Sequence, residues 1–452
     1  MTAIPWPLFT QVQFWQKKGR PLKRLVRTII LLMVRLLGGP GAQAAAQSTR
    51  KPLTATPHIL LVRPDHLGDL LLTTPVFHAL KQQAPNAHIT MMVGPWSSEV
   101  VERHPDIDRV MTCPFPGFQR SAQKALAPYI LLFNTAKQLR RDQFDLSINL
   151  RPDFWWGAAL LYLARIPRRV GYALEQAKPF LTHALPFQSP EHATVSNLRL
   201  ASAALLSIGY PPLDEPYTPE HYPLHFTPTP GEHRWVTNRL HNEGIEPHNV
   251  RAGLAPALET PSPARANPAP IVVIHPGSGA AVKLWRTEGW ATCADALTKT
   301  LTIATPVCIM LTGSKNERPM LEEIARNMQS TAVLVTGATI GQLAALLARA
   351  QLVLSVDSGP LHLAVSQGTP TVQLFGPTDP RIFGPWGICE RHIVLASTHR
   401  CPTCPTIPCG RLDFPPEALV DHPCVRLITE QQVLAAVEKL LQQSSSIKYR
   451  SF

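Results

Sequence analysis

Three short segments place polar and charged side chains directly after apolar runs, where α/β proteins carry much of their chemistry. In the first, ILLVRPDHLGDLLL, Gly68 and Asp69 stand where a predicted buried strand gives way to a helix. Doubly wound sheets bind ligands at this edge. At such a site Gly68 would allow a ligand to approach the backbone closely, and the carboxylate of Asp69 could act as a base. A single aspartate at such a turn more often only caps the helix, and this alternative stays open.

The other two segments are suited to holding a diphosphate. In IVVIHPGSGAAVK, a loop containing Ser278 follows an apolar run and precedes Lys283, although the spacing of a Walker motif is absent. In LVLSVDSGPLHL, Asp357, Ser358 and Gly359 open a helix that carries His362. The free amides of a helix N-terminus bind anions. Taken singly, the Ser278 segment also fits a structural turn with an exposed lysine. The Asp357 segment also fits a simple N-cap with a satisfied, partly buried histidine.

Apolar runs separated by helical stretches predict the parallel sheets that would position these segments. A helix is expected over residues 70–83, another over residues 341–349, and a last one after Thr429, which forms a capping box with Gln432. Strands are expected at residues 58–63, 88–93, 110–113 and 144–150, then at residues 271–275, 307–312, 332–335, 352–356 and 371–375.

The length of 452 residues is too great for one typical domain and suits two α/β domains. A Pro- and Ala-rich tract, RAGLAPALETPSPARANPAP, predicts a linker or surface loop. We therefore expect an N-terminal arm at residues 1–56, a first domain at 57–248, a linker at 249–270 and a second domain at 271–452.

The net charge of +12 lies mostly in the arm, because residues 1–51 contain nine Lys or Arg and no Asp or Glu, which leaves +3 for the rest. A nucleic-acid partner is therefore not expected. The apolar run at residues 28–34 is far shorter than the roughly 20 residues that span a bilayer. A basic amphipathic helix on an anionic membrane surface is our main prediction, with a cleavable signal peptide or a plain disordered extension as alternatives.

Two further groups could bind a metal ion. Asp106 and Asp108 form an Asp-x-Asp pair, but they lie in a loop far in sequence from the second half, so a metal there is not favoured. The C-terminal cysteines have ligands of the right type for zinc, yet such thiols can also simply pack, and packing is the preferred interpretation. These cysteines are Cys401, Cys404, Cys409 and Cys424.

The three segments, in this order, resemble those of the ADP-heptose:lipopolysaccharide heptosyltransferase family, glycosyltransferase family 9, over roughly residues 57–440. The stretch SVDSGPLHLAVSQGTPTVQLFGPTDP carries the resemblance most specifically, and FDLSINLR, RIPRRVGY, NLRLASAALLSIG and the cysteine cluster support it. The resemblance implies a GT-B fold, with two Rossmann-like domains facing a central cleft, the acceptor on the N-terminal half and the nucleotide-sugar on the C-terminal half.

The resemblance also implies roles for single residues. Asp69 matches the catalytic aspartate, next to the loop glycine Gly68, and Glu317 matches more loosely a carboxylate on the ribose. Lys283 and the Ser278 loop lie where the donor phosphates are held, although that loop departs from the family pattern. Asp357, Ser358, Gly359 and His362 match the donor-binding loop.

We therefore expect an inverting glycosyltransferase that uses a nucleotide-sugar, ADP-heptose by resemblance, and a lipid-linked or surface-glycan acceptor such as the lipopolysaccharide core. No cofactor and no metal are expected. The expected location is the cytoplasm, at the inner membrane surface. The alternatives are another nucleotide-sugar donor, a nucleotide-sugar epimerase of the same fold, or a non-catalytic glycan- or nucleotide-binding protein.

Overall fold

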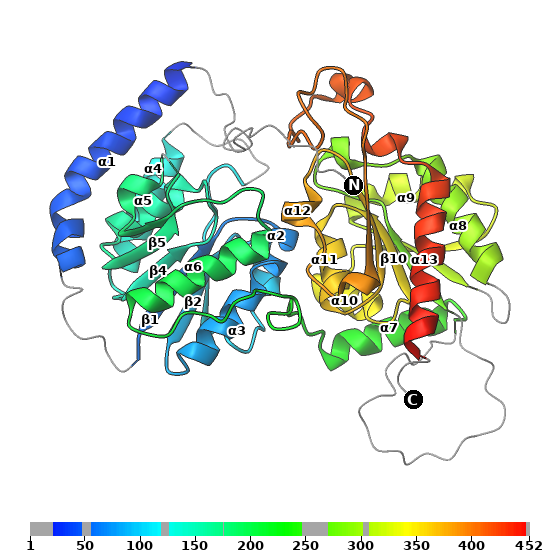
Figure 1. Ribbon diagram of the computed structural model, residues 1–452, viewed down its shortest axis with the longest axis horizontal. Coiled ribbons are helices and arrows are strands. Elements are labelled where there is room, and N and C mark those ends of the chain that lie inside the picture. The colour runs from blue at the N-terminus through cyan, green and yellow to red at the C-terminus, as the bar shows by residue number, and fades with distance from the viewer. Residues whose placement is uncertain are drawn as a thin grey trace, which may run out of the picture. The chain divides into compact units, whose positions relative to one another are not determined.

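The computed structural model describes residues 21–47, 56–118, 126–174, 176–245, 270–301 and 307–448 (Figure 1). The chain divides into two compact units, Met1–Tyr217 and Thr218–Phe452. Most of the tract expected to be a linker, residues 249–269, lies outside the described ranges.

The division between the units falls earlier than the boundary expected at residue 248. Helix α7 (Pro230–Asn242) belongs to the second unit, because it packs on α10 (Ile340–Leu347). Hydrogen bonds tie α7 to this unit: Arg349 donates to Thr237 Oγ1 at 2.6 Å and to the carbonyl of His233 at 3.4 Å, and Arg239 donates to the carbonyl of Leu334 at 3.2 Å. The expected boundary was based on the change of composition at the Pro/Ala tract, and that composition carries no information about the contacts of α7.

The first unit is a parallel six-stranded sheet covered by helices on both faces (Figure 1). Its strand order is β3-β2-β1-β4-β5-β6, and the central strand reads HILLVR with every residue after the first buried, as expected of a strand covered on both sides. Helix α3 packs with α6, and α4 packs with α5. The elements are β1 (His58–Arg63), β2 (His88–Val93), β3 (Arg109–Thr112), β4 (Leu146–Asn149), β5 (Arg168–Tyr172), β6 (His183–Leu185), α1 (Pro21–Gln47), α2 (Leu67–Leu71), α3 (Thr74–Gln83), α4 (Ala127–Leu139), α5 (Trp155–Leu163) and α6 (Ala193–Ser207).

The second unit repeats this architecture. Its parallel six-stranded sheet has the order β12-β11-β10-β7-β8-β9, so along the chain both sheets follow the 3-2-1-4-5-6 order of Rossmann folds. The elements are β7 (Ile271–His275), β8 (Cys308–Gly313), β9 (Ala332–Thr336), β10 (Leu352–Val356), β11 (Thr371–Phe375), β12 (His392–Ala396), α7, α8 (Thr287–Leu301), α9 (Arg318–Asn327), α10, α11 (Gly359–Ser366), α12 (Pro380–Phe383) and α13 (Glu430–Lys448).

The prediction of two α/β units with parallel sheets is confirmed, and each expected strand is present with its ends shifted by at most two residues. The expected capping box between Thr429 and Gln432 also forms. The helix expected over residues 70–83 is two helices, α2 and α3, and Pro75 lies in the first turn of the second one, where proline is tolerated. Strands β5, β6 and β12 were not predicted, since β5 begins with two arginines and β6 is a short edge strand.

Helix α1 packs against α5 in the first unit. Val34 and Ala42 are buried there, and Tyr162 donates a hydrogen bond of 2.9 Å to the carbonyl of Arg35. The helix contains Pro40 and bends by 54° between residues 28–36 and 38–47, as proline in a helix interior causes. No single helix in the described ranges is long and apolar enough to cross a membrane; the two bent halves of α1 reach that length and composition only together.

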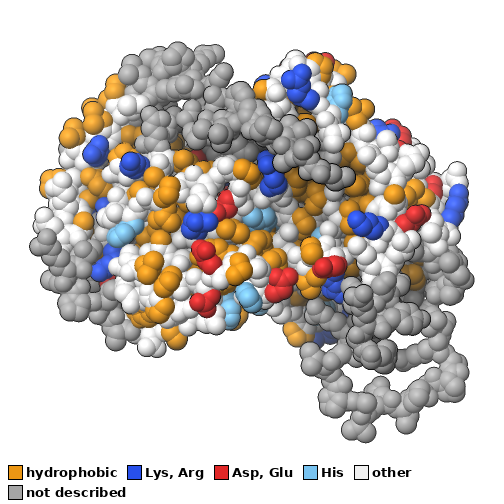
Figure 2. Space-filling model, viewed as in Figure 1, with side chains coloured by type: hydrophobic (Ala, Val, Ile, Leu, Met, Phe, Trp, Pro, Cys, Tyr) orange, Lys and Arg blue, Asp and Glu red, His pale blue; other side chains and the backbone are white. Residues whose placement is uncertain are grey.

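The other side of α1 is apolar and exposed. Its large hydrophobic side chains there, 44 to 68% exposed, are Ile29, Leu32, Met33 and Leu36. Hydrophobic side chains are visible in Figure 2 along the edge of the first unit on which α1 lies. Residues 1–20, which complete the expected basic arm, lie outside the described ranges.

Candidate functional site

The first group of candidate residues lies at the carboxyl ends of β1 and β4, where the strand order of the first sheet reverses. Open α/β sheets bind their ligands at this switch point. Asp65 and Asp69 follow β1, and Arg151 and Asp153 follow β4. The topology therefore brings together two segments that are far apart in sequence: one with two carboxylates after β1, and one with an arginine and a carboxylate after β4.

Asp65 is fully engaged in ion pairs. Its Oδ2 lies 2.6 Å from Nε of Arg63, and its Oδ1 accepts a short hydrogen bond from Arg151. Burial alone would raise the pKa of Asp65, but the two arginines outweigh it and hold that pKa below its usual range. A buried carboxylate held ionised between two guanidinium groups is a poor proton acceptor, so Asp65 is an unsuitable base.

Asp69 has a different environment. The N-cap of α2 is His66, so Asp69 lies inside the first turn of the helix and not at the capping position. Its side chain is 33% exposed, against 3% for Asp65, and its Oδ1 lies 3.3 Å from the Nη2 of Arg63. Asp69 is therefore the most exposed of the three carboxylates in this group, since the Asp153 side chain is 22% exposed, and a general base must be within reach of its substrate.

Arg63 and Arg151 were not assigned roles from the sequence, and they organise this group. Arg63 is buried and donates to the carbonyl of Leu150 at 2.9 Å and to Oδ1 of Asn197 at 3.1 Å. Arg151 also donates to Asp153 at 2.7 Å. Arg63 ends a buried strand and Arg151 follows one closely. A polar residue at the end of a buried strand is the pattern that indicated Asp69, so the same pattern could have identified both arginines.

The second group lies at the switch point of the second sheet, at the carboxyl ends of β7 and β10. Lys283, in a 3-10 turn after β7, places Nζ 3.0 Å from Oδ2 of Asp357, which follows β10. Thr378, after β11, donates to the same oxygen at 2.7 Å. Burial alone would raise the pKa of Asp357, but Lys283 and the Thr378 hydroxyl keep it below its usual range. Asp357 therefore positions Lys283, and sequence reasoning missed Thr378.

Hydroxyl groups surround this ion pair. Ser278 Oγ donates to the carbonyl of Asp357 at 3.4 Å, and the Ser358 hydroxyl lies 3.1 Å from that of Ser355. Ser358 is the N-cap of α11 and makes no side-chain capping bond; Gly359 is the first helical residue. The start of α11 thus brings backbone amides and a hydroxyl to the switch point next to Lys283, a combination that binds phosphate groups.

His362 is 3% exposed on α11, and its Nδ1 has no hydrogen-bond partner among the described residues. Burial lowers its pKa to about 4; the nearby Asp357 raises the pKa and Lys283 lowers it. The imidazole is therefore neutral at pH 7. A buried, unpaired polar atom at a ligand-binding edge indicates that a ligand or water completes its hydrogen bonding.

Glu317 lies at the carboxyl end of the neighbouring strand, β8. It forms a capping box with Ser314, whose backbone amide donates to Oε2 at 2.7 Å. Gly277 lies against the Glu317 carboxylate, since a Cβ on this glycine would overlap it. Burial lowers the pKa of His275 to about 4, although Glu317 raises it. Glu317 is thus next to the loop that carries Ser278, and the ribose contact that the resemblance implies for it stays a prediction.

The Asp-x-Asp pair has structural partners. Asp108 accepts from Lys81 at 2.9 Å and from the backbone amide of Ile89 at 2.7 Å, and these bonds outweigh partial burial and lower its pKa. Asp106 lies 3.1 Å from the ring of His78. Among the described residues this pair is not part of a group with metal-ligand geometry. It fastens the loop before β3 to β2 and α3.

Comparison with known proteins assigns the chain to a protein family. The family model for glycosyltransferase family 9 (heptosyltransferase) matches residues 132–409. The chain is 28% identical over 328 residues to lipopolysaccharide heptosyltransferase 3 of Escherichia coli, an alignment that covers 71% of this chain and 83% of that protein. It is 26% identical over 330 residues to lipooligosaccharide heptosyltransferase 2 of Haemophilus ducreyi, covering 71% and 84%.

Solved structures share the fold. A glycosyl transferase family 9 protein from Veillonella parvula superposes with a TM-score of 0.62 at 22% identity, over 86% of this chain and 97% of that one. The Escherichia coli ADP-heptose lipopolysaccharide heptosyltransferase II superposes with a TM-score of 0.59 at 19% identity, over 86% and 99%. The expected GT-B fold class, with two Rossmann-like units, is confirmed.

Proposed function

The chain belongs to glycosyltransferase family 9 and is a glycosyltransferase, and we propose that it transfers heptose from ADP-heptose to a lipopolysaccharide-core or related surface-glycan acceptor, with inversion at the anomeric carbon. One observation carries the choice of donor class: the Lys283–Asp357 pair lies beside the start of α11 at a Rossmann switch point. This combination is suited to a nucleoside diphosphate.

The proposal gives each unit one task. In the second unit, Lys283, Ser278, Ser358, Gly359 and His362 hold the donor diphosphate, and Glu317 holds the ribose. In the first unit, Asp69 accepts the proton of the acceptor hydroxyl. The acceptor oxygen forms its bond to the anomeric carbon on the face opposite the diphosphate, the bond from that carbon to the phosphate oxygen breaks, and the nucleoside diphosphate leaves with the electron pair.

The departing diphosphate needs positive charge as its bond breaks. Lys283 supplies a full charge, the α11 amides supply partial charges, and Ser358 and the neutral His362 supply hydrogen bonds. We propose that these groups stabilise the leaving group without a divalent cation or another cofactor. Transfer at an undiminished rate in buffer stripped of Mg²⁺ and Mn²⁺ would support this part of the proposal.

We also propose that the enzyme works in the cytoplasm at the surface of the inner membrane. The relatives are heptosyltransferases of lipopolysaccharide and lipooligosaccharide, which are lipid-linked glycans. The exposed apolar side of α1 supports this location, and α4, which also packs on α5, exposes Leu126, Ile130 and Phe133. The basic residues of the arm would attract anionic lipid headgroups.

A panel of nucleotide-sugars tests the donor assignment. The full-length protein is heated with ADP-heptose and with UDP-, GDP- and ADP-linked hexoses, each at about 100 times a micromolar Kd, where binding adds about 2.7 kcal/mol to the free energy of unfolding. We expect a selective rise in Tm with ADP-heptose, followed by transfer to a core acceptor that lacks the last heptose. A selective rise with a UDP- or GDP-sugar would replace the donor. Binding without transfer to any acceptor would favour the non-catalytic alternative.

A further inference from the structure

The loop between β12 and α13, residues 397–429, is long for a connection without strands. It contains only 3-10 turns, at Pro416–Asp421 and Val425–Leu427. Its C-terminal end is held by Trp285, whose indole donates to the carbonyl of Ile428 at 2.9 Å, and by Arg286, which donates to the carbonyl of Arg426 at 2.8 Å. Long loops without regular secondary structure are uncommon in compact domains. The bonds from Trp285 and Arg286 fix only the C-terminal end of this loop, so its N-terminal part must be stabilised by other contacts.

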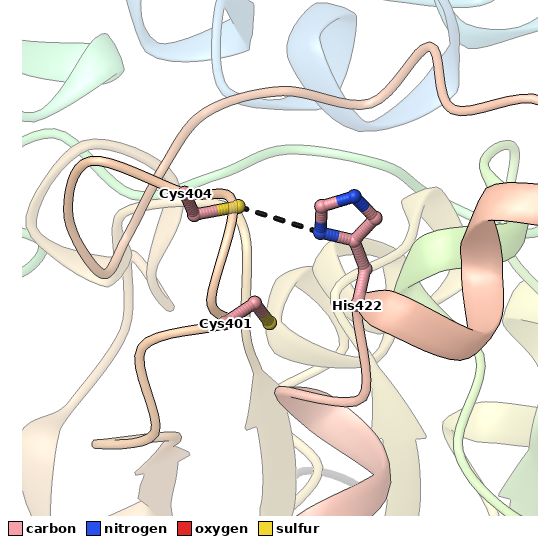
Figure 3. A group of neighbouring side chains, drawn as sticks. All are labelled: Cys401, Cys404 and His422. Carbon is pink, nitrogen blue, oxygen red and sulfur yellow. Dashed lines mark hydrogen bonds between the residues drawn. The ribbon is translucent and has the colours of Figure 1, made fainter.

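The rest of the loop is gathered around a cluster of thiols and one imidazole, shown in part in Figure 3. We name this the cysteine cluster; its members are Cys401, Cys404, Cys409, Cys424 and His422. The ligand atoms of Cys401, Cys404 and His422 all lie within 4.8 Å of one another. Cys404 Sγ lies 3.4 Å from Nδ1 of His422.

The fourth and fifth members are neighbours of the first three. The thiol of Cys424 interacts with that of Cys401, and the thiol of Cys409 interacts with that of Cys404, although neither belongs to the group of ligand atoms that all lie within 4.8 Å of one another. These two cysteines differ in burial: Cys424 is 2% exposed, whereas Cys409 is only partly buried. The buried members of the set therefore supply three sulfur atoms and one nitrogen.

The imidazole is oriented as a ligand would be. Nδ1 of His422 faces the thiols, while Nε2 lies 3.5 Å from the hydroxyl of Thr403. The ring also packs on Phe414, with centroids 3.6 Å apart. Metal-bound histidines commonly use the second ring nitrogen for a hydrogen bond that fixes their orientation.

Simple packing accounts poorly for this arrangement. Elsewhere in the described ranges buried cysteines occur singly in apolar surroundings, as Cys113 and Cys293 do. In the cysteine cluster, two sulfur atoms and a ring nitrogen, those of Cys401, Cys404 and His422, lie within 4.8 Å of one another although about twenty residues separate the histidine from the cysteines. Two cysteines in a C-x₂-C spacing, followed by a distant donor pair, match the pattern of structural zinc sites.

We propose that the cysteine cluster binds one zinc ion, held by Cys401, Cys404 and His422, with the buried neighbour Cys424 completing a tetrahedral Cys₃His ligand set. Zinc is favoured because three thiolates and an imidazole are the donors of closed structural zinc sites. Packed, metal-free thiols were preferred from the sequence because His422 was not included among the possible ligands. His422 is remote in sequence from the C-x₂-C pair, and no local pattern marks it as a ligand.

The ion would also act on the donor site of the proposed function. The backbone amide of Gly410 donates to the carbonyl of Pro377 at 2.7 Å, and Cys424 Sγ lies next to Gly376, where a Cβ would come within 3.0 Å of it. Segment 376–378 carries Thr378, the hydrogen-bond partner of Asp357. A zinc-bound loop thus supports the residue that helps to position Lys283.

Metal content is the direct test, and it does not depend on the enzymatic activity. The full-length protein, purified without metal-affinity chromatography, is analysed by elemental mass spectrometry. We expect about one zinc per chain, and the cobalt-substituted protein should show the thiolate charge-transfer and visible bands of a tetrahedral site. Protein without bound metal, carrying four reactive thiols in the cluster, would overturn the proposal, and iron in place of zinc would overturn the identity of the ion.

Single variants test the ligand assignment. Cys404→Ser and His422→Gln should lower the zinc content at least tenfold, whereas Cys409→Ser and the matched control Cys389→Ser, an exposed cysteine outside the cluster, should keep it. Cobalt spectra of the wild type provide the readout if Cys404→Ser does not fold. Retained zinc in His422→Gln together with loss in Cys409→Ser would contradict the ligand set. Weaker donor binding after loss of zinc would support the proposed effect of the loop on Thr378 and the donor site. If the protein binds zinc but uses no nucleotide-sugar, only the proposed function is contradicted.

Discussion

Lys283 and Asp357 are 74 residues apart in the chain, yet their Nζ and Oδ2 atoms lie 3.0 Å apart at the reversal of the second sheet's strand order. The pair is nearly buried, with side-chain exposures of 14% and 9%. Asp357 therefore holds the amine in place and partly neutralises it. An anionic ligand would compete with Asp357 for the lysine, so the charge balance of the site changes when a diphosphate binds.

The first prediction separates donor binding from stability at this pair. Lys283→Met should weaken binding of the nucleotide-sugar and also lower Tm, because it leaves the buried carboxylate of Asp357 unpaired, at a cost of about 3–5 kcal/mol. Calorimetric titration with the donor and thermal unfolding measure the two effects. Lys283→Met combined with Asp357→Asn should recover much of the stability but not the affinity. If the double variant binds donor as the wild type does, Lys283 is not a diphosphate ligand.

The second prediction concerns Asp65. Asp65→Asn should destabilise the protein by up to about 3–5 kcal/mol, because Arg63 and Arg151 lose the buried carboxylate that lies between them and keep only Asp69 and Asp153 as counter-ions. Denaturant unfolding measures this effect. Glu322→Gln, which removes an exposed ion pair with Arg318, is the control and should cost less than about 1 kcal/mol. Equal effects in the two variants would mean that the Asp65 pair is not buried in solution.

The third prediction is a pH dependence of stability. Burial lowers the pKa of His275, His362 and His392 to about 4, below the 6.5 of an exposed histidine. As the pH falls from 6.5 to 4, the unfolded chain takes up protons that the folded chain does not, so the free energy of unfolding decreases across this window. We expect a lower Tm at pH 4.5 than at pH 7. His392→Gln should reduce this dependence, whereas the exposed His399 should not affect it when changed to Gln; the reverse result would contradict the assignment.

The fourth prediction is membrane attachment through α1. The helix also packs on α5, so deletion of the whole arm would expose apolar surface, and substitutions on its outer side are cleaner. Leu32→Glu with Leu36→Glu should abolish binding to anionic liposomes at low salt. Val420→Glu, at a site 75% exposed in the second unit, is the control and should bind normally. The hypothesis fails if the wild type does not bind such liposomes, or if its mature N-terminus lies beyond Ala46.

The sequence predicted the parts of the fold and site that depend on local pattern. Buried strands followed by Gly, Ser and Asp loops located Asp69, Ser278 and Asp357, because a strand end and a helix start are visible in a dozen residues. The GT-B fold and the residue roles came from resemblance to a family. The positions of candidate residues along the strands were therefore predictable.

Long-range pairing was not predictable in this way. The bonds of Arg63 to Leu150 and of Arg151 to Asp65 span 87 and 86 residues, and nothing in either local sequence specifies the partner. The same holds for Thr378 and Asp357, and for His422 in the cysteine cluster. The end of the first unit was missed because α7 belongs with α10 through packing that its own sequence does not reveal.

The most direct test of the mechanism is the turnover of Asp69→Asn with the nucleotide-sugar and acceptor. Asparagine keeps the size of the side chain and cannot accept the proton, and the side chain is 33% exposed, so the fold should be little affected. Loss of a general base costs about 100- to 10,000-fold in rate. We predict a fall of at least about 100-fold in turnover, with donor affinity and Tm close to those of the wild type. Near-normal turnover in Asp69→Asn, with activity abolished in folded Asp65→Asn, would contradict the assignment of the base.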